Sequence, residues 1–255
     1  GARYAIHLLN EAIALLPSAH DSAAHPVDSG MDGWLHGLHG LALIASGDRA
    51  SGEARLEAAV MLSGTAHSPI DTRRWLTALG DGALLRGAYD RALLAYRRAL
   101  AVPNAPGADG GRAAALLGLS RTLLATHVLP DADGEPQDNA VHSARQALDA
   151  AQASGDARLI AAAHGMLGEA LHLSGAQHDA LPHLRAALEG GDAPLSTRRV
   201  LAGALFAAGE HEEALALFAA AAADADRQAQ HDTRRSDAVL EAAGLRRDMG
   251  WARWH

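Results

Sequence analysis

The chain has 255 residues and a formal net charge of −8 at pH 7, which argues against a nucleic-acid-binding surface, because phosphate binding needs a basic face. It contains no cysteine and no lysine, which excludes thiol catalysis, thiolate metal sites, Schiff-base chemistry and a Walker lysine. Hydrophobic residues, mostly Ala and Leu, make up 49% of the chain and aromatic residues only 4%, a composition that favours an all-α fold. No apolar run is long enough to span a membrane.

The first predicted element is a helix over residues 3–16. Ala5, Leu9 and Ala12 recur at spacings of four and three, and Pro17 follows the helix. Residues 1–17 are therefore expected to form a terminal helix. The polar residues 18–32, which include Pro and Gly, are expected to form a linker.

The clearest pattern lies at residues 73–102 and predicts two amphipathic helices joined by a tight turn. Leu76, Leu79 and Ala83 place an apolar stripe along the first helix. Gly87 stands where that helix must end, since glycine adopts a left-handed C-cap without steric cost. The second helix carries its own stripe, with Tyr96 between the two helices. A hairpin of this kind cannot bury both faces alone, so we expect copies of it on either side.

Residues 73–102 resemble a tetratricopeptide repeat (TPR), a helical hairpin with small or large residues at fixed positions. With Arg73 as position 1, the matching residues at positions 7, 8, 15, 20, 24 and 27 are Leu79, Gly80, Gly87, Ala92, Tyr96 and Ala99. Pro103 lies one residue short of the closing proline of the family. The resemblance implies a right-handed α-solenoid of TPR-like helical hairpins.

Further units follow the same pattern along most of the chain. They are expected at about 33–66, 73–103, 111–154, 156–190 and 193–230, with a partial unit at 231–255. Gly47, Gly175 and Gly209 fall at position 15 of their units. Gly52, at position 20 of the first full unit, is expected to weaken its second helix. The longer spacings between some of these glycines resemble the repeats in TPR sensor arms of large bacterial STAND ATPases and LuxR-type regulators.

No motif in the sequence supports catalysis or a metal site. Residues 28–30 read Asp-Ser-Gly, as in aspartic proteases, but that chemistry needs two such loops with paired carboxylates. His36 and His39 have a spacing that metal ligands use, but no third ligand is placed beside them. We therefore expect no catalytic residue, no metal, no cofactor and no enzymatic activity.

In the TPR family the first helices of the hairpins line a concave groove, and positions 2, 5, 9 and 12 point into it. Carried onto this sequence, the resemblance implies a partner-binding groove formed by Trp34, Leu41, Ile44, Arg74, Thr77, Asp81, Arg112, Leu119, Glu169, His172, Arg199 and Phe206. Arginine can bind a carboxylate through two hydrogen bonds, and Trp or Phe can anchor an apolar group, so an acidic peptide is a suitable occupant. Alternatively, Arg74 and Arg199 are solvated or pair with Asp81 and Glu169. The carboxylate clamp of chaperone-binding relatives is absent, because Thr77 and Asp81 stand at its Lys and Asn positions.

The sequence therefore predicts a non-catalytic cytoplasmic scaffold that binds a protein or peptide and forms one module of a larger regulatory protein. One alternative is an effector-sensing domain of a transcription regulator or signalling ATPase, which predicts a deep, closed small-molecule pocket near Trp34 and Phe206. A second alternative is an enzyme with a site across the superhelix. Self-association is expected through the terminal apolar stripes, formed by Ile6, Leu9 and Ile13 at one end and by Val239, Leu240 and Trp251 at the other.

Overall fold

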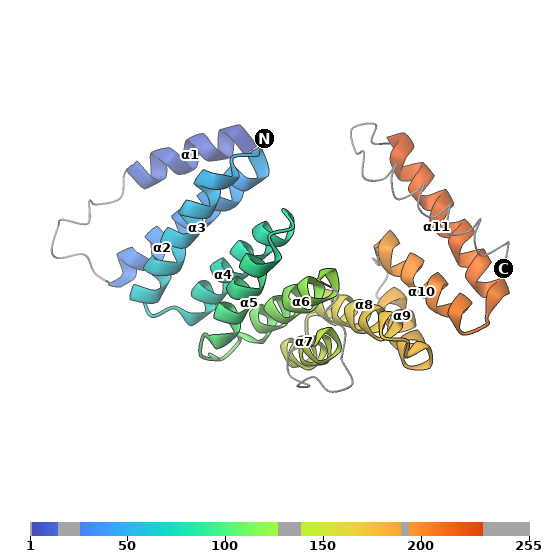
Figure 1. Cartoon of the computed structure of the whole chain (residues 1–255). Helices are drawn as coiled ribbons and strands as arrows, with labels where there is room; N and C mark the ends of the chain where they lie inside the picture. Colours follow the sequence, from blue (N-terminus) through green and yellow to red (C-terminus); the bar gives the residue numbers. More distant parts are fainter. Residues whose placement is uncertain (1, 15–25, 127–138, 190–193, 232–255) are drawn as a thin grey trace. The chain divides into compact units, whose positions relative to one another are not determined.

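The structure, a computed structural model, describes residues 2–14, 26–126, 139–189 and 194–231. Within these ranges the chain forms eleven α-helices and no strand, as the all-α prediction requires (Figure 1). The helices are α1 (Ala2–Ala14), α2 (Pro26–Ser46), α3 (Arg49–Thr65), α4 (Pro69–Leu84), α5 (Tyr89–Ala101), α6 (Asp109–Ala125), α7 (Ala140–Ser154), α8 (Ala157–Leu173), α9 (Gln177–Glu189), α10 (Leu195–Ala207) and α11 (His211–His231). None of the described helices is long and apolar enough to cross a membrane.

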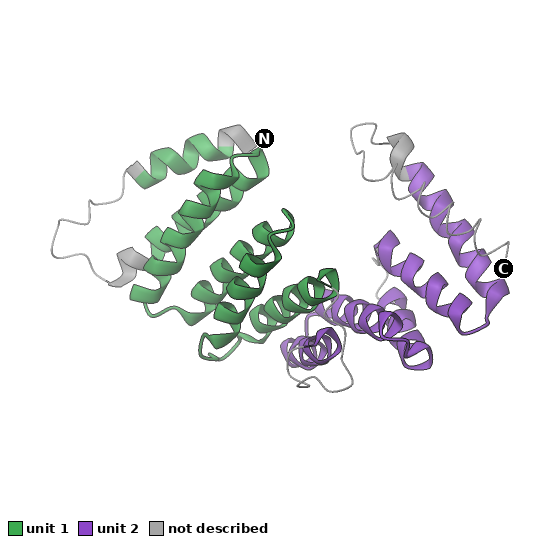
Figure 2. Cartoon of the chain, viewed as in Figure 1, with its two compact units in different colours: residues 1–128 green, residues 129–255 purple. Residues whose placement is uncertain are grey.

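The chain divides into two compact units, residues 1–128 and residues 129–255 (Figure 2). In the first unit α2 packs on α3 and α4 on α5, while α1 covers α2 and α6 packs against both α4 and α5. In the second unit α8 packs on α9 and α10 on α11, with α7 against α8 and α10 against both helices of the preceding hairpin. Each unit is thus built from helical hairpins stacked side by side.

A glycine in the left-handed region ends the first helix of four hairpins. The φ angles of Gly47, Gly87, Gly175 and Gly209 are 99°, 70°, 85° and 89°. A residue with a Cβ is strained at such angles, which explains why glycine stands at position 15 of these units. The tight turn predicted at Gly87 is confirmed.

Tyr96 holds three helices of the first unit together. Its ring lies in a notch between Gly80 of α4 and Gly118 of α6, where a Cβ on either glycine would come within 2.6 Å and 2.3 Å of the ring. Its hydroxyl donates a 2.6 Å hydrogen bond to the Asp81 carboxylate. Burial, the Asp81 charge and this hydrogen bond raise the pKa of Tyr96, so the phenol stays protonated and keeps donating.

One of the predicted boundaries differs from the structure. Helix α2 begins at Pro26, inside the range 18–32 that was expected to be a linker, so the Asp-Ser-Gly sequence at 28–30 lies on a helix. Proline has no backbone N–H to lose at the first turn of a helix, which suits Pro26 to this place. Residues 18–25 and 232–255, the latter including Val239, Leu240 and Trp251, lie outside the described residues.

Candidate partner-binding site

A pocket of about 420 Å³ lies between the first helices of two neighbouring hairpins in the second unit. Its lining comes from three helices: Glu169, His172 and Leu173 of α8, Ser196, Arg199, Val200, Gly203 and Phe206 of α10, and Phe218 of α11. Four of the predicted groove residues, namely Glu169, His172, Arg199 and Phe206, therefore meet in one pocket. Its volume is within the range of small-ligand sites in proteins.

Two close approaches fix the register of α8 against α10. A Cβ built on Gly165 would lie 3.6 Å from the Thr197 side chain, and one built on Gly203 would lie 3.4 Å from His172 Nε2. The two helices therefore run parallel, and in these two contacts the residue of α8 faces one that is 31 or 32 positions later in α10. This register gives the pocket a polar end and an apolar end. The polar end holds Ser196, Arg199 and Glu169, and the apolar end holds Leu173 and Phe206.

Hydrogen bonds to Gln177 fix the orientation and tautomer of the His172 ring. Gln177 Nε2 donates to the backbone carbonyl of His172 at 3.2 Å, which turns Gln177 Oε1 toward the ring. Oε1 can only accept, so His172 Nδ1 carries the hydrogen and donates to it at 2.5 Å. In the neutral ring Nε2 is then a hydrogen-bond acceptor, and it faces the backbone of α10 at Gly203.

Aromatic rings form the apolar end of the pocket. Phe206 packs edge-to-face on His211, with ring centroids 4.6 Å apart and an interplanar angle of 66°. Phe218 is almost completely buried and belongs to the core that joins α10 and α11. These rings are held by their own neighbours, so the apolar end of the pocket is formed before any ligand arrives.

In the first unit a stripe of apolar residues on α2 includes two of the predicted groove residues. Its members are Met31, Trp34, Leu38 and Leu41, each of which is more than a third exposed. The Trp34 ring packs edge-on against Trp75, with centroids 5.4 Å apart, and the Arg74 guanidinium lies 4.5 Å from the Trp34 centroid. Arginine and tryptophan are thus adjacent here on the faces of α2 and α4.

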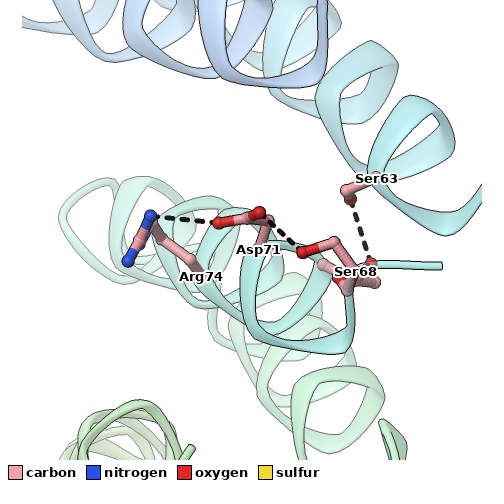
Figure 3. A network of polar contacts seen from close by, with 5 residues as sticks. Ser63, Ser68, Asp71 and Arg74 are labelled. Atoms are coloured by element: carbon pink, nitrogen blue, oxygen red, sulfur yellow. Dashed lines mark hydrogen bonds and ion pairs between the residues drawn. The ribbon is translucent and has the colours of Figure 1, made fainter. Parts of the chain in front are cut away.

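Arg74 has a carboxylate partner, and it differs from the Asp81 partner considered from the sequence. Arg74 Nη1 lies 3.1 Å from Asp71 Oδ1 one turn earlier on α4, and the other oxygen of Asp71 accepts a 2.6 Å hydrogen bond from the Ser68 hydroxyl. Figure 3 shows the Arg74 and Ser68 side chains on opposite sides of the Asp71 carboxylate. Arg74 is exposed and Asp71 is partly buried, and an ion pair with an exposed arginine contributes little to stability.

The remaining predicted groove residues have structural contacts. Thr77 and Leu119 are buried, with 8% and 7% of their surface exposed, and the Thr77 hydroxyl donates to the Arg73 carbonyl at 2.8 Å. Ile44 packs against the core of the first unit, and Asp81 accepts the Tyr96 hydroxyl. Arg112 is partly buried and acts with burial to lower the pKa of the neighbouring Arg73. The position rule of the family thus selected these residues without indicating how deeply each one lies.

Sequence reasoning missed a histidine pair on the hairpin formed by α8 and α9. The Nδ1 atoms of His164 and His183 lie 3.0 Å apart, with ring centroids 5.2 Å apart. Burial lowers the pKa of both rings. The two residues stand on different helices and follow no ligand motif, so nothing in their spacing pairs them.

The described residues hold no group of three or more His, Cys, Asp or Glu side chains that could bind a metal ion. His36 Nδ1 lies 3.4 Å from Arg55 Nη1, while His39 is buried with 3% of its surface exposed. Burial, followed by the charge of Arg55, lowers the pKa of both histidines. His36 therefore lies in a partly buried contact with Arg55, whereas His39 lies in the core, so the two rings have different environments.

No family model and no curated protein matches the sequence. Among solved structures the chain is similar to the apo form of RapI, with a TM-score of 0.64 and 13% identity over 95% of this chain and 71% of RapI. It is also similar to TTC0263, a thermophilic TPR protein of Thermus thermophilus, with a TM-score of 0.49 and 22% identity over 84% of this chain and 98% of that protein. At these identities the likeness is one of fold. The stacked hairpins and their glycine-ended first helices thus give this chain a TPR-like helical-repeat fold, as its repeat pattern predicts.

Proposed function

We propose that this chain is a non-catalytic binding module that holds a segment of a partner protein against the first helices of its hairpins. The observation that carries the proposal is the pocket between α8 and α10, where Glu169, His172, Arg199 and Phe206 come together. A cation beside an aromatic wall suits a peptide that offers a carboxylate next to a large apolar side chain. The apolar stripe of α2, with Arg74 beside Trp34, offers a similar combination in the first unit.

We propose an acidic peptide because a peptide carboxylate can bind the Arg199 guanidinium at the polar end, where it would share that arginine with the contacts made inside the protein. Arginine presents its N–H groups in a planar fork that matches the two oxygens of a carboxylate. The Phe206 ring stands about two helical turns further along α10, so one extended segment can reach both with neighbouring side chains. A module of this kind would serve within a larger cytoplasmic regulatory protein.

Selection of random-sequence peptides displayed on phage tests the proposal directly. We expect the full chain to enrich acidic peptides that also carry a large apolar residue. Arg199→Glu should weaken binding of the selected peptides about tenfold or more, since it removes a charge-assisted hydrogen bond and adds a repelling carboxylate. Arg158→Glu is the matched control, because Arg158 is an exposed arginine of α8 that does not line the pocket.

The charge-matched pair of variants makes the outcome decisive. If Arg158→Glu binds the selected peptides as the unaltered chain does and Arg199→Glu does not, the pocket binds them. If the two variants bind equally well, or if no peptide family is enriched, the proposed function is wrong. Either of those results would favour the second candidate function, in which the pocket binds a small molecule.

Effector sensing is the second candidate function, and the pocket volume of about 420 Å³ favours it, since small-molecule sites begin at about 300 Å³. The pocket includes Phe206, but it is open to solvent on one side and Trp34 does not line it, so it differs from the closed site that was expected near these two residues. A screen of small organic acids by thermal shift of the full chain tests this function. A ligand whose stabilising effect persists in Phe206→Ala would exclude the pocket as its site.

A further inference from the structure

The pocket between α8 and α10 contains a hydrogen-bond acceptor, His172 Nε2, in addition to the donors of Arg199. His172 Nε2 is a hydrogen-bond acceptor in the neutral ring, because Nδ1 is committed to Gln177 Oε1 at 2.5 Å. It lies midway along the pocket, between the polar end at Arg199 and the apolar end at Phe206. An acceptor in this place selects a ligand group that donates an N–H or O–H.

The shape of the pocket at His172 depends on Gly203. A Cβ on Gly203 would lie 3.4 Å from His172 Nε2 and 3.8 Å from Cε1, so its absence leaves the space directly before the acceptor open. Alanine would favour the helix more than glycine does, and Gly203 is neither at a positive φ nor at a helix end. Nothing in the local backbone requires glycine there. What the glycine provides is room beside the imidazole.

The surroundings of this space are aromatic and aliphatic. Phe206 lies one turn beyond Gly203 on α10, Leu173 follows His172 on α8, and Phe218 closes the pocket from α11. A flat ring packs edge-to-face or offset against phenylalanine more favourably than a branched aliphatic group does. The ligand group that fits both requirements is an aromatic ring that carries a hydrogen-bond donor.

We infer that the pocket between α8 and α10 is an anchor site for a tyrosine or tryptophan side chain of the bound peptide, with the donor of the ring bonded to His172 Nε2. This inference rests on the proposed function and names the residue that the pocket recognises. Phenylalanine supplies the ring without the donor, so it would leave the acceptor desolvated and unpaired. The site therefore distinguishes tyrosine and tryptophan from phenylalanine.

The test uses the full chain and three uncharged probes, N-acetyl-tyrosinamide, N-acetyl-tryptophanamide and N-acetyl-phenylalaninamide, titrated by NMR. We expect the tyrosine and tryptophan amides to bind about 3- to 10-fold more tightly than the phenylalanine amide, the difference that one net hydrogen bond makes. Gly203→Ala should abolish this preference, because its methyl group fills the space before His172 Nε2. His172→Phe should abolish it as well, since it removes the acceptor but keeps a ring.

Gly165→Ala is the matched control. Gly165 is also an interior helical glycine that faces a neighbouring helix, where its Cβ would lie 3.6 Å from Thr197, but it does not line the pocket. This variant should keep the full preference for tyrosine and tryptophan. Thermal unfolding of Gly203→Ala should show no loss of stability, so that a change in binding reports on the pocket alone.

The results separate this inference from the proposed function. If phage peptides bind in an Arg199-dependent way while the three amides bind equally, the aromatic anchor is wrong and the peptide-binding function stands. If Gly203→Ala keeps the preference for tyrosine, the anchor is also wrong, because the donor then bonds elsewhere. If no peptide is selected at all, the proposed function fails and this inference fails with it.

Discussion

The two units use different residues at the same repeat positions, and this explains why the pocket lined by Glu169 and Gly203 opens in the second unit. At position 24 the hairpin of α4 and α5 in the first unit has Tyr96, whereas the two hairpins of the second unit have Leu184 and Phe218. The Tyr96 hydroxyl extends past Gly80 to position 9, where it bonds to Asp81 at 2.6 Å. In the second unit position 9 is held by Glu169 and Gly203, and both line the pocket. In the first unit the hydrogen bond between Tyr96 and Asp81 fills the space at position 9, and in the second unit the corresponding space is part of the pocket.

Position 1 shows the same contrast. Arg73 is buried, with 1% of its surface exposed, whereas Ala161 and Leu195 stand at this position in the second unit. The Arg73 guanidinium donates to the carbonyls of Ala99, Ala108, Val102 and Pro103 and to Asn104 Oδ1 at 2.7–3.4 Å. It thereby satisfies the carbonyls at the end of α5 and in the loop that follows. In the first unit a buried arginine thus adds directional hydrogen bonds to an apolar core, whereas the ion pairs of Arg185 and Arg198 in the second unit are partly exposed.

Removing the Arg73 guanidinium should have the largest effect on stability. Arg73→Ala leaves several buried carbonyls without a donor, and we expect it to lower the free energy of unfolding of the first unit by about 3–5 kcal/mol. Chemical denaturation gives the total change, and hydrogen exchange read by mass spectrometry assigns it to residues 1–128. Exchange in the second unit should be unchanged.

Arg74→Ala is the control for Arg73→Ala, because it removes the adjacent, largely exposed arginine and its pair with Asp71. It should change the free energy of unfolding by about 0–1 kcal/mol. Equal effects of the two substitutions would show that the buried carbonyls find other donors. The hydrogen bonds of Arg73 would then not be a source of stability that distinguishes the first unit from the second.

Filling the notch around Tyr96 should have the second largest effect. In Gly118→Ala the new Cβ would lie 2.3 Å from the Tyr96 ring, which is held by its hydrogen bond to Asp81 and cannot simply turn away. We expect a loss of about 1–3 kcal/mol, typical of overpacking in a core. Gly111→Ala, on the same helix, has 3.6 Å to its nearest neighbour and should instead stabilise the protein by about 0.5–1 kcal/mol. If the denaturation curves of Gly118→Ala and Gly111→Ala shift in the same direction, the close packing of Tyr96 against Gly118 does not limit stability.

Much of the hairpin arrangement could be predicted from the sequence, because the sequence pattern repeats from one hairpin to the next. The turn at Gly87 and the placement of Tyr96 between helices could be predicted, since both depend on local periodicity and a recurring hairpin. Gly52 was expected to weaken α3, but its missing Cβ lets α3 approach Gly40 of α2, where that atom would lie 2.8 Å from the Gly40 carbonyl oxygen. A single sequence does not show which neighbouring residue packs closely against a glycine.

The role of Arg73 was not predictable for a different physical reason. Its acceptors lie 26 to 35 residues later, at the end of one helix and in a loop that the repeat pattern does not describe. The candidate site was predicted in part, because groove positions selected Glu169, His172, Arg199 and Phe206 but not Gly203. Side chains can be assigned to a face from helical periodicity, whereas the space left by an absent Cβ depends on the register between two helices.

Acidification should have the smallest effect, and it should act on the second unit through the histidine pair. Burial lowers the folded-state pKa of His164 below 6.5, and burial, His164 and Arg145 lower that of His183 against the opposing effect of Asp179. The unfolded chain therefore binds more protons than the folded chain as the pH falls, so stability is greatest above pH 6.5 and declines below it. Both rings are partly exposed, which keeps the effect small.

His183→Gln tests this, because it removes one of the two titratable rings and leaves a side chain that can hydrogen bond to His164. Hydrogen exchange of the second unit should lose part of its pH dependence in this variant, while the exposed His178→Gln on the same helix should behave as the unaltered chain. The first unit should keep its own decline with acid, since burial also lowers the pKa of His36 and His39. If His183→Gln leaves the acid response of residues 129–255 unchanged, the pair does not couple proton binding to the packing of α8 on α9.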